Sequence, residues 1–158
     1  MSKSENFDEI ENVDIVNEND EILFSVPKTE AHQKGLLHRT VIAEIKDKQG
    51  RWILIRQSPI KQDSGQFVSP VGGHVKSGET VQEALKREAL EEAGLASFKY
   101  KYIGKTIYNR NVLSRHENHY FILYEIFKQS GALTACVLPG LFPGLFSIAG
   151  ISSPLNPG

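Results

Sequence analysis

The sequence predicts a single domain of the α+β class. Several short segments rich in β-branched and aromatic residues are separated by polar turns, and one longer segment has the composition of a helix. The chain has 158 residues, 40% of them hydrophobic, which is enough for a core without disulfides or a structural metal. Its one cysteine, Cys136, excludes an intrachain disulfide, and a reducing, cytoplasmic location is expected.

The predicted strands form two hairpins and three further segments. Residues 13–16 and 21–26 flank a polar tetrad at 17–20, and residues 40–45 and 52–56 flank a second turn at 47–50. Residues 98–103, 106–112 and 119–127 are the other candidates, and the last has the nearly continuous apolar pattern of a buried strand.

One helix is predicted over residues 81–93, with a signal at each end. Thr80 and Glu83 have the spacing of a capping box, and Gly94 lies where a helix-ending glycine belongs. The segment between them is rich in Ala, Leu, Glu, Gln, Lys and Arg, which favour helices.

Charge divides the chain into three parts. Residues 1–21 hold eight acids and one base, and we expect residues 1–11 to be disordered. Residues 12–128 are the expected domain, and residues 129–158 carry no charge and repeat the sequence Pro-Gly-Leu-Phe. Proline and glycine disfavour a membrane helix in this tail, so we expect it to be irregular, with a membrane tail as the minority alternative. An altered reading frame or a truncation with a replaced end is our hypothesis for its origin. The net charge of −1 gives no support for nucleic-acid binding.

Three acids of the predicted helix fall beside its apolar residues. At about 100° per residue, Glu88, Glu91 and Glu92 lie near the stripe that contains Ala84 and Leu85. Like charges spaced three and four apart repel one another, and the repulsion grows where water is excluded. The pattern indicates either a solvated acidic face or a site for a hard divalent cation such as Mg²⁺ or Mn²⁺.

Residues 73–95 resemble the Nudix hydrolase family, whose fingerprint is G-x5-E-x7-R-E-U-x-E-E-x-G-U, with U a bulky aliphatic residue. The charged and glycine positions of the fingerprint are all matched, and Ala89 is a small residue at the first U position. The resemblance implies an α/β/α sandwich with a mixed β-sheet. Its C-terminal helix is expected to be missing or replaced, since residues 129–158 have no amphipathic pattern. The matching residues are Gly73, Glu79, Arg87, Glu88, Glu91, Glu92, Gly94 and Leu95.

The flanking sequence is similar to the branch related to isopentenyl-diphosphate isomerase. That isomerase has a catalytic cysteine before its Gly-His pair and a Glu-x-Glu on a later strand, where this chain has Gly72 and Glu117-Asn118-His119. Without the thiol we do not expect isomerisation as the main activity. His32, His38 and His119 match the surroundings of the isomerase metal site only in part, and structural roles are expected for them.

The resemblance implies roles for particular residues. Glu88 and Glu92 are expected metal ligands, Glu91 a third ligand or a bridge through water, and Gly72 a carbonyl ligand. Arg87 is expected to orient Glu88, and either Glu88 or Glu117 to act as the general base. The expected catalytic residues are Glu88, Glu91, Arg87 and Glu117; the expected substrate-binding residues are Arg39, Arg56 and His74.

The expected activity is hydrolysis of a phosphoanhydride bond, with Mg²⁺ or Mn²⁺, in a nucleoside diphosphate linked to another moiety X or in a nucleoside di- or triphosphate. A non-catalytic nucleotide- or diphosphate-binding module is the main alternative, and an isomerase-like enzyme a lesser one. The expected partner is a small nucleotide or diphosphate, without nucleic acid or membrane, and a homodimer is possible.

Overall fold

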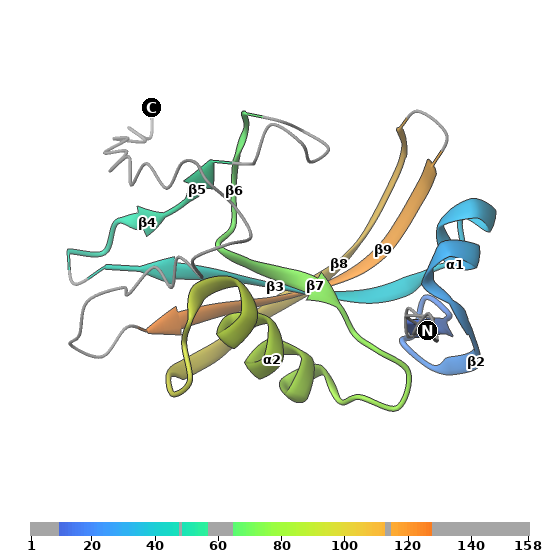
Figure 1. The fold of residues 1–158 in the computed structure, drawn as a ribbon, viewed down its shortest axis with the longest axis horizontal. Coiled ribbons are helices and arrows are strands. Elements are labelled where there is room, and N and C mark those ends of the chain that lie inside the picture. Colours follow the sequence, from blue (N-terminus) through green and yellow to red (C-terminus); the bar gives the residue numbers. More distant parts are fainter. Residues whose placement is uncertain (1–9, 48, 57–64, 113–114, 128–158) are drawn as a thin grey trace, which may run out of the picture.

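The computed structural model describes residues 10–47, 49–56, 65–112 and 115–127, which form a mixed β-sheet with two helices (Figure 1). The predicted α+β class is confirmed. Residues 1–9 and the tail at 129–158 lie outside the described residues, and with them the expected N-terminal disorder and the question of a C-terminal helix. The elements are β1 (Asn12–Val16), β2 (Ile22–Pro27), α1 (Lys28–Lys34), β3 (His38–Lys46), β4 (Trp52–Ile53), β5 (Ile55–Arg56), β6 (Phe67–Val68), β7 (Val71–His74), α2 (Val81–Ala93), β8 (Lys99–Val112) and β9 (Arg115–Phe127).

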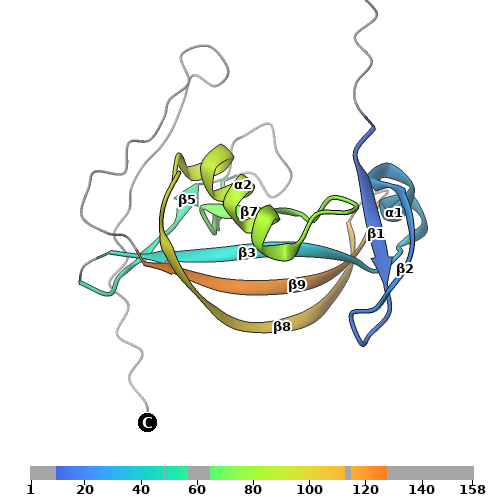
Figure 2. The same ribbon diagram turned by 90° about the horizontal axis from the view of Figure 1, so that it is seen from below.

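The main sheet is built around β3. Its strand order is β2-β1-β3-β9-β8, and β4 and β7 also pair with β3. Strands β3 and β9 run parallel, with His38 opposite His119, whereas β7 is antiparallel to β3 and places His74 opposite Thr40. Helix α2 lies over one face of the sheet, while α1 and the β1–β2 hairpin lie at one end of it (Figure 2).

Helix α2 has the predicted boundaries. The Thr80 hydroxyl accepts a hydrogen bond from the Glu83 N–H, and the Glu83 carboxylate accepts one from the Thr80 N–H. Gly94 ends the helix at a φ of 65°, a left-handed conformation that costs glycine least. Local sequence therefore determines both ends of this helix.

The apolar stripe of α2 differs from the prediction. Ala84 and Leu85 are buried as expected, Ala89 is buried as well, and Glu88 is only 8% exposed beside them. Glu91 and Glu92 are exposed, because the buried positions of the helix end at Ala89. The stripe prediction is thus right for Glu88 and wrong for the other two acids.

Strands β8 and β9 form a long hairpin. The two strands predicted at 98–103 and 106–112 are one strand, β8, whose register shifts between Tyr102 and Gly104. A bulge of this kind bends the strand and increases its twist. Both strands are visibly curved (Figure 2).

Three short elements were not predicted. Helix α1 has only seven residues and strands β6 and β7 two and four, too few for a clear periodic pattern. The hairpin expected from 40–45 and 52–56 is shorter than predicted, because β3 and β4 pair where Ile45 is opposite Ile53 and Lys46 is opposite Trp52. Strand β5 pairs with β6 instead. The first hairpin, β1–β2, is confirmed. Neither described helix is long and apolar enough to cross a membrane.

Candidate active site and a histidine cluster

Glu88 lies directly against the backbone of β7. A Cβ atom at Gly73 would collide with the Glu88 carboxylate, whereas a Cβ at Gly72 would meet only the Val41 carbonyl oxygen, at 3.7 Å. Glycine is therefore needed at position 73 for close approach of the helix carboxylate, which gives the first fingerprint glycine a steric role.

Arg87 connects α2 with the loop that precedes it. Its Nε and Nη2 donate to the two carboxylate oxygens of Glu79 at 2.8 and 2.9 Å, and Nη2 also donates to the His74 carbonyl at 2.9 Å. Its Nη1 donates to Glu88 at 2.5 Å and lies 3.4 Å from a Glu91 oxygen. Glu79 and Glu88 raise the pKa of Arg87 by more than burial lowers it. The guanidinium is therefore charged at any working pH. The expected orienting role of Arg87 has this geometric basis.

The Glu88 carboxylate is held in an unfavourable electrostatic environment. Burial raises its pKa, Arg87 opposes that effect, and the charges of Glu91 and Glu92 raise it further. A divalent cation would relieve this repulsion, and carboxylate oxygens are the ligands that Mg²⁺ and Mn²⁺ prefer. The donor set of the helix end therefore suits a hard cation.

The other expected site residues are distributed over the sheet. Glu117 pairs with Arg110 of β8 at 2.6 Å, and its charge acts on His119 two residues later. Arg39 pairs with Asp20 at 2.6 Å. The Nε of Arg56 donates to the Gly65 carbonyl at 3.2 Å. The metal, catalytic and substrate-binding roles assigned from the sequence remain predictions.

Four histidines come together on the sheet. They are contributed by α1, β3, β7 and β9, and their potential ligand atoms all lie within 4.8 Å of one another. Burial, with repulsion from the neighbouring histidines, lowers the pKa of His74 to about 2 and that of His119 to about 4. These rings are therefore neutral at pH 7, and His74 has no positive charge to offer a phosphate. The cluster is formed by His32, His38, His74 and His119.

The register of the sheet brings the histidines together, and that register cannot be read from the sequence. His38 and His119 are opposite each other in the parallel β3–β9 pair, and β7 adds His74 opposite Thr40, two residues along β3 and on its other side. The partial similarity of three of these residues to the isomerase metal site was the available sequence signal.

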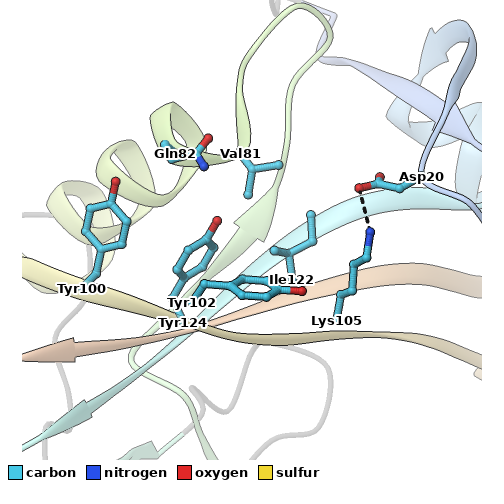
Figure 3. A pocket seen from close by; sticks show the side chains of 8 residues that line it. All are labelled: Asp20, Val81, Gln82, Tyr100, Tyr102, Lys105, Ile122 and Tyr124. Atoms are coloured by element: carbon cyan, nitrogen blue, oxygen red, sulfur yellow. Dashed lines mark ion pairs between the residues drawn. The ribbon is translucent and has the colours of Figure 1, made fainter.

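A pocket of about 390 Å³ lies between the start of α2, strands β8 and β9, and the β1–β2 turn. Three tyrosine rings gather at one side of it, and an ion pair between Asp20 and Lys105 lies at the other (Figure 3). None of its lining residues belongs to the histidine cluster or is a fingerprint acid. They are Asp20, Val81, Gln82, Tyr100, Tyr102, Lys105, Ile122 and Tyr124.

The family model for the NUDIX domain matches residues 36–142, so the chain belongs to the Nudix family. The match runs past residue 128, where the sequence suggested a domain boundary. A Nudix hydrolase of Deinococcus radiodurans is 40% identical over 84 residues, which are 52% of this chain and 48% of that protein. An isopentenyl-diphosphate Delta-isomerase of Serratia proteamaculans is 36% identical over 84 residues, 52% of this chain and 47% of that protein.

The fold has a solved counterpart. The crystal structure of protein DR0079 from Deinococcus radiodurans superposes with a TM-score of 0.61 and 29% identity, covering 77% of this chain and 74% of the other. This chain spans about half the length of the two relatives named above. The expected family, its isomerase-related branch and the Nudix fold are confirmed.

Proposed function

We propose that this chain hydrolyses a phosphoanhydride bond, with Mg²⁺ or Mn²⁺, in a nucleoside diphosphate linked to another moiety or in a nucleoside di- or triphosphate. The observation that carries the proposal is the arrangement around Arg87, which holds Glu88 against Gly73 and joins it to Glu79. A surface helix has no need for a buried glutamate fixed in this way.

Each residue of the arrangement has a role in such a reaction. Glu88 and Glu92, with Glu91 and the Gly72 carbonyl, would hold the metal, which neutralises charge on the phosphoryl oxygens and activates water. Arg87 fixes the direction of the Glu88 carboxylate. A general base takes a proton from the attacking water, and Glu88 and Glu117 are the two candidates.

Basic residues at Arg39 and Arg56, with the neutral imidazole of His74 as a hydrogen-bonding group, are proposed to contact the substrate. We place the reaction in the cytoplasm, on a small-molecule substrate, in line with the single cysteine of the chain. A non-catalytic binding module is the main alternative. Isomerisation is disfavoured by Gly72, which offers no side chain for proton transfer.

The test is ³¹P NMR of the purified protein with nucleoside di- and triphosphates, ADP-ribose and isopentenyl diphosphate, each with and without Mg²⁺. We expect metal-dependent cleavage of the phosphoanhydride bond that falls by about 10²-fold or more in Glu92→Gln, the size of effect seen when one charge-stabilising group is removed. Glu83→Gln is the matched control, because it lies on the same helix, is exposed, and glutamine also serves in a capping box.

Two outcomes would contradict the proposal. Hydrolysis that is equal in Glu92→Gln and Glu83→Gln would exclude the helix acids as the metal site. No reaction across the panel, in protein shown to be folded, would favour the binding module. Loss of the general base removes the limb of the pH–rate profile that its ionisation produces, so the pH–rate profiles of Glu117→Gln and Glu88→Gln compare the two candidate bases.

A further inference from the structure

The pocket beside the start of α2 is separate from the fingerprint acids. In the sheet, β7 and β9 pair with opposite sides of β3, and β8 follows β9. Glu88 lies against β7 at Gly73, whereas the pocket lies over β8 and β9. Neighbouring strands are about 4.8 Å apart, so three strand spacings, about 14 Å, separate β7 from β8. A ligand in the pocket would therefore occupy a second site.

A bulge in β8 places a lysine beside the tyrosines of this pocket. Side chains alternate between the faces of a strand, so two residues three apart, such as Tyr102 and Lys105, ordinarily lie on opposite faces. Ile103, between Tyr102 and Gly104, is an extra residue in the pairing with β9. Because of it, Lys105 lies opposite Ile122, on the same face as Tyr102, and both line the pocket. Re-aiming a side chain next to a functional site is a common use of a bulge.

Three tyrosine rings form one side of the pocket (Figure 3). Tyr100 and Tyr102 meet the ring of Tyr124 edge-on, with centroids 5.6 and 5.8 Å away. Tyr124 is only 4% exposed, yet its hydroxyl makes no hydrogen bond to any residue that the structure describes. Burial and the two neighbouring tyrosines raise the pKa of Tyr124, so the hydroxyl keeps its proton at neutral pH and can donate to a ligand. This side offers both aromatic surface and a free hydrogen-bond donor.

The other side of the pocket has a surplus positive charge. The Asp20 carboxylate accepts a hydrogen bond from Arg39 at 2.6 Å and lies 3.5 Å from the Lys105 ammonium. One carboxylate therefore faces two cations, and one positive charge is left over. Hydrogen bonding to Tyr120 and the charge of Asp20 raise the pKa of Lys105, so its ammonium is charged at neutral pH. An exposed ion pair of this length is weak, which leaves the ammonium available to an anion.

We propose that this pocket binds a planar nitrogen heterocycle that carries one anionic group, such as a nucleoside monophosphate or a heteroaromatic carboxylic acid. The ring would pack against the tyrosines, and the Tyr124 hydroxyl and the Gln82 amide would bond its polar edge. Lys105 would bind the anionic group. The volume of about 390 Å³ is within the range of small-molecule pockets. The proposal uses no fingerprint residue, so it does not depend on the proposed hydrolysis.

The test is isothermal titration calorimetry of the full chain in EDTA, which keeps divalent ions away from the helix acids. The probes are AMP and indole-3-acetate, each compared with its neutral counterpart, adenosine or indole-3-acetamide. We expect one site per chain for at least one anionic probe, with an affinity about 5-fold or more above that of its neutral counterpart. Binding of AMP identifies a phosphate ligand, and binding of indole-3-acetate identifies a carboxylate ligand.

Variants of β8 separate the two halves of the pocket. Tyr102→Leu should weaken the anionic probe by about 10-fold or more, because one aromatic surface is lost. Lys105→Gln should remove the preference for the anionic over the neutral probe. The matched controls are Tyr108→Leu and Lys101→Gln, because both residues are exposed on β8 and lie opposite His119 and Glu125, on the other face of the sheet. Both controls should bind as the wild type does.

Glu92→Gln should also bind the probes as the wild type does, so failure of this proposal is distinguishable from failure of the proposed hydrolysis. In NMR of wild-type protein with labelled tyrosines, the bound probe should shift the ring signals of Tyr100, Tyr102 and Tyr124 and leave Tyr108 in place. Absence of binding by both anionic probes would overturn the proposal. So would equal binding by Lys105→Gln and Lys101→Gln, or a loss of binding confined to Glu92→Gln.

Discussion

At the scale of single residues, the position of the Glu88 carboxylate against β7 depends on the absence of one side chain. Gly73 is where β7 and the Glu88 carboxylate meet, and Gly72 beside it has room for a Cβ. Two adjacent glycines of one strand thus have different constraints. That difference provides a matched pair of substitutions.

We expect Gly73→Ala to displace Glu88, lowering the proposed hydrolysis by about 10²-fold or more and the free energy of unfolding by about 1–3 kcal/mol, as overpacking does. Gly72→Ala keeps the backbone carbonyl and should change the free energy of unfolding by less than about 1 kcal/mol. Urea denaturation and initial rates with the substrate found by ³¹P NMR measure both effects. Equal behaviour of the two variants would show that Glu88 does not need its position against the strand.

At the scale of elements, α2 is joined to its preceding loop by the Glu79–Arg87 ion pair. Burial of the Glu79 carboxyl opposes ionisation, but hydrogen bonds from Arg87 and from the Lys76 backbone N–H outweigh it and lower the pKa below the ordinary 4.5. Because the Glu79 pKa is lower in the folded state than in the unfolded state, ionisation of Glu79 stabilises the folded protein at pH values above the unfolded-state pKa. That stabilisation is lost as pH falls through the folded-state value.

Glu79→Gln should therefore lower the free energy of unfolding by about 1–2 kcal/mol at pH 7. This is the contribution of a charge-assisted hydrogen bond, reduced because the pair is partly exposed to solvent. The cost should shrink as pH falls below 4.5, where the unfolded wild-type carboxyl takes up its proton first. Urea denaturation of both proteins at pH 7 and at pH 3.5, about one unit below the ordinary value, measures the change. A cost that is the same at both pH values would mean that the charge of Glu79 does not matter.

The elements also show where sequence reasoning succeeds. The ends of α2 were predictable because a capping box and a left-handed glycine act over a few neighbouring residues. Helix α1 and strand β7 were not, because their short segments are stabilised by the sheet rather than by local preference. The bulge at Tyr102 and Gly104 made one curved strand look like two.

At the scale of the whole molecule, side chains attach the β1–β2 hairpin to the rest of the sheet. Strand β1 pairs with β3 only at Ile15 and His38. Asp20, in the hairpin turn, accepts hydrogen bonds from Arg39 on β3 and lies 3.5 Å from Lys105 on β8. Asp20 therefore joins the hairpin turn to β3 and β8 at one point.

Asp20→Asn keeps a residue type that tolerates the φ of 69° at this position but removes the charge. We expect a loss of about 1 kcal/mol in unfolding free energy and faster hydrogen exchange over residues 12–27. Glu30→Gln, which breaks the exposed pair with Lys34 within α1, should cost about 0.5 kcal/mol or less. If hydrogen exchange in the hairpin is the same in both variants, its attachment does not depend on Asp20.

The sequence by itself determined the α+β class, the boundaries of α2 and the spacing of the fingerprint, because each depends on local composition and periodicity. It also placed Glu88 on the buried side of the helix, where the structure has it. Only the tertiary structure decided that Arg87 also binds Glu79 and which strands lie beside each other. The histidine cluster joins residues up to 87 positions apart, from His32 to His119, and strand register brought them within ligand distance. Register depends on packing across the whole sheet, and no single segment of the sequence specifies it.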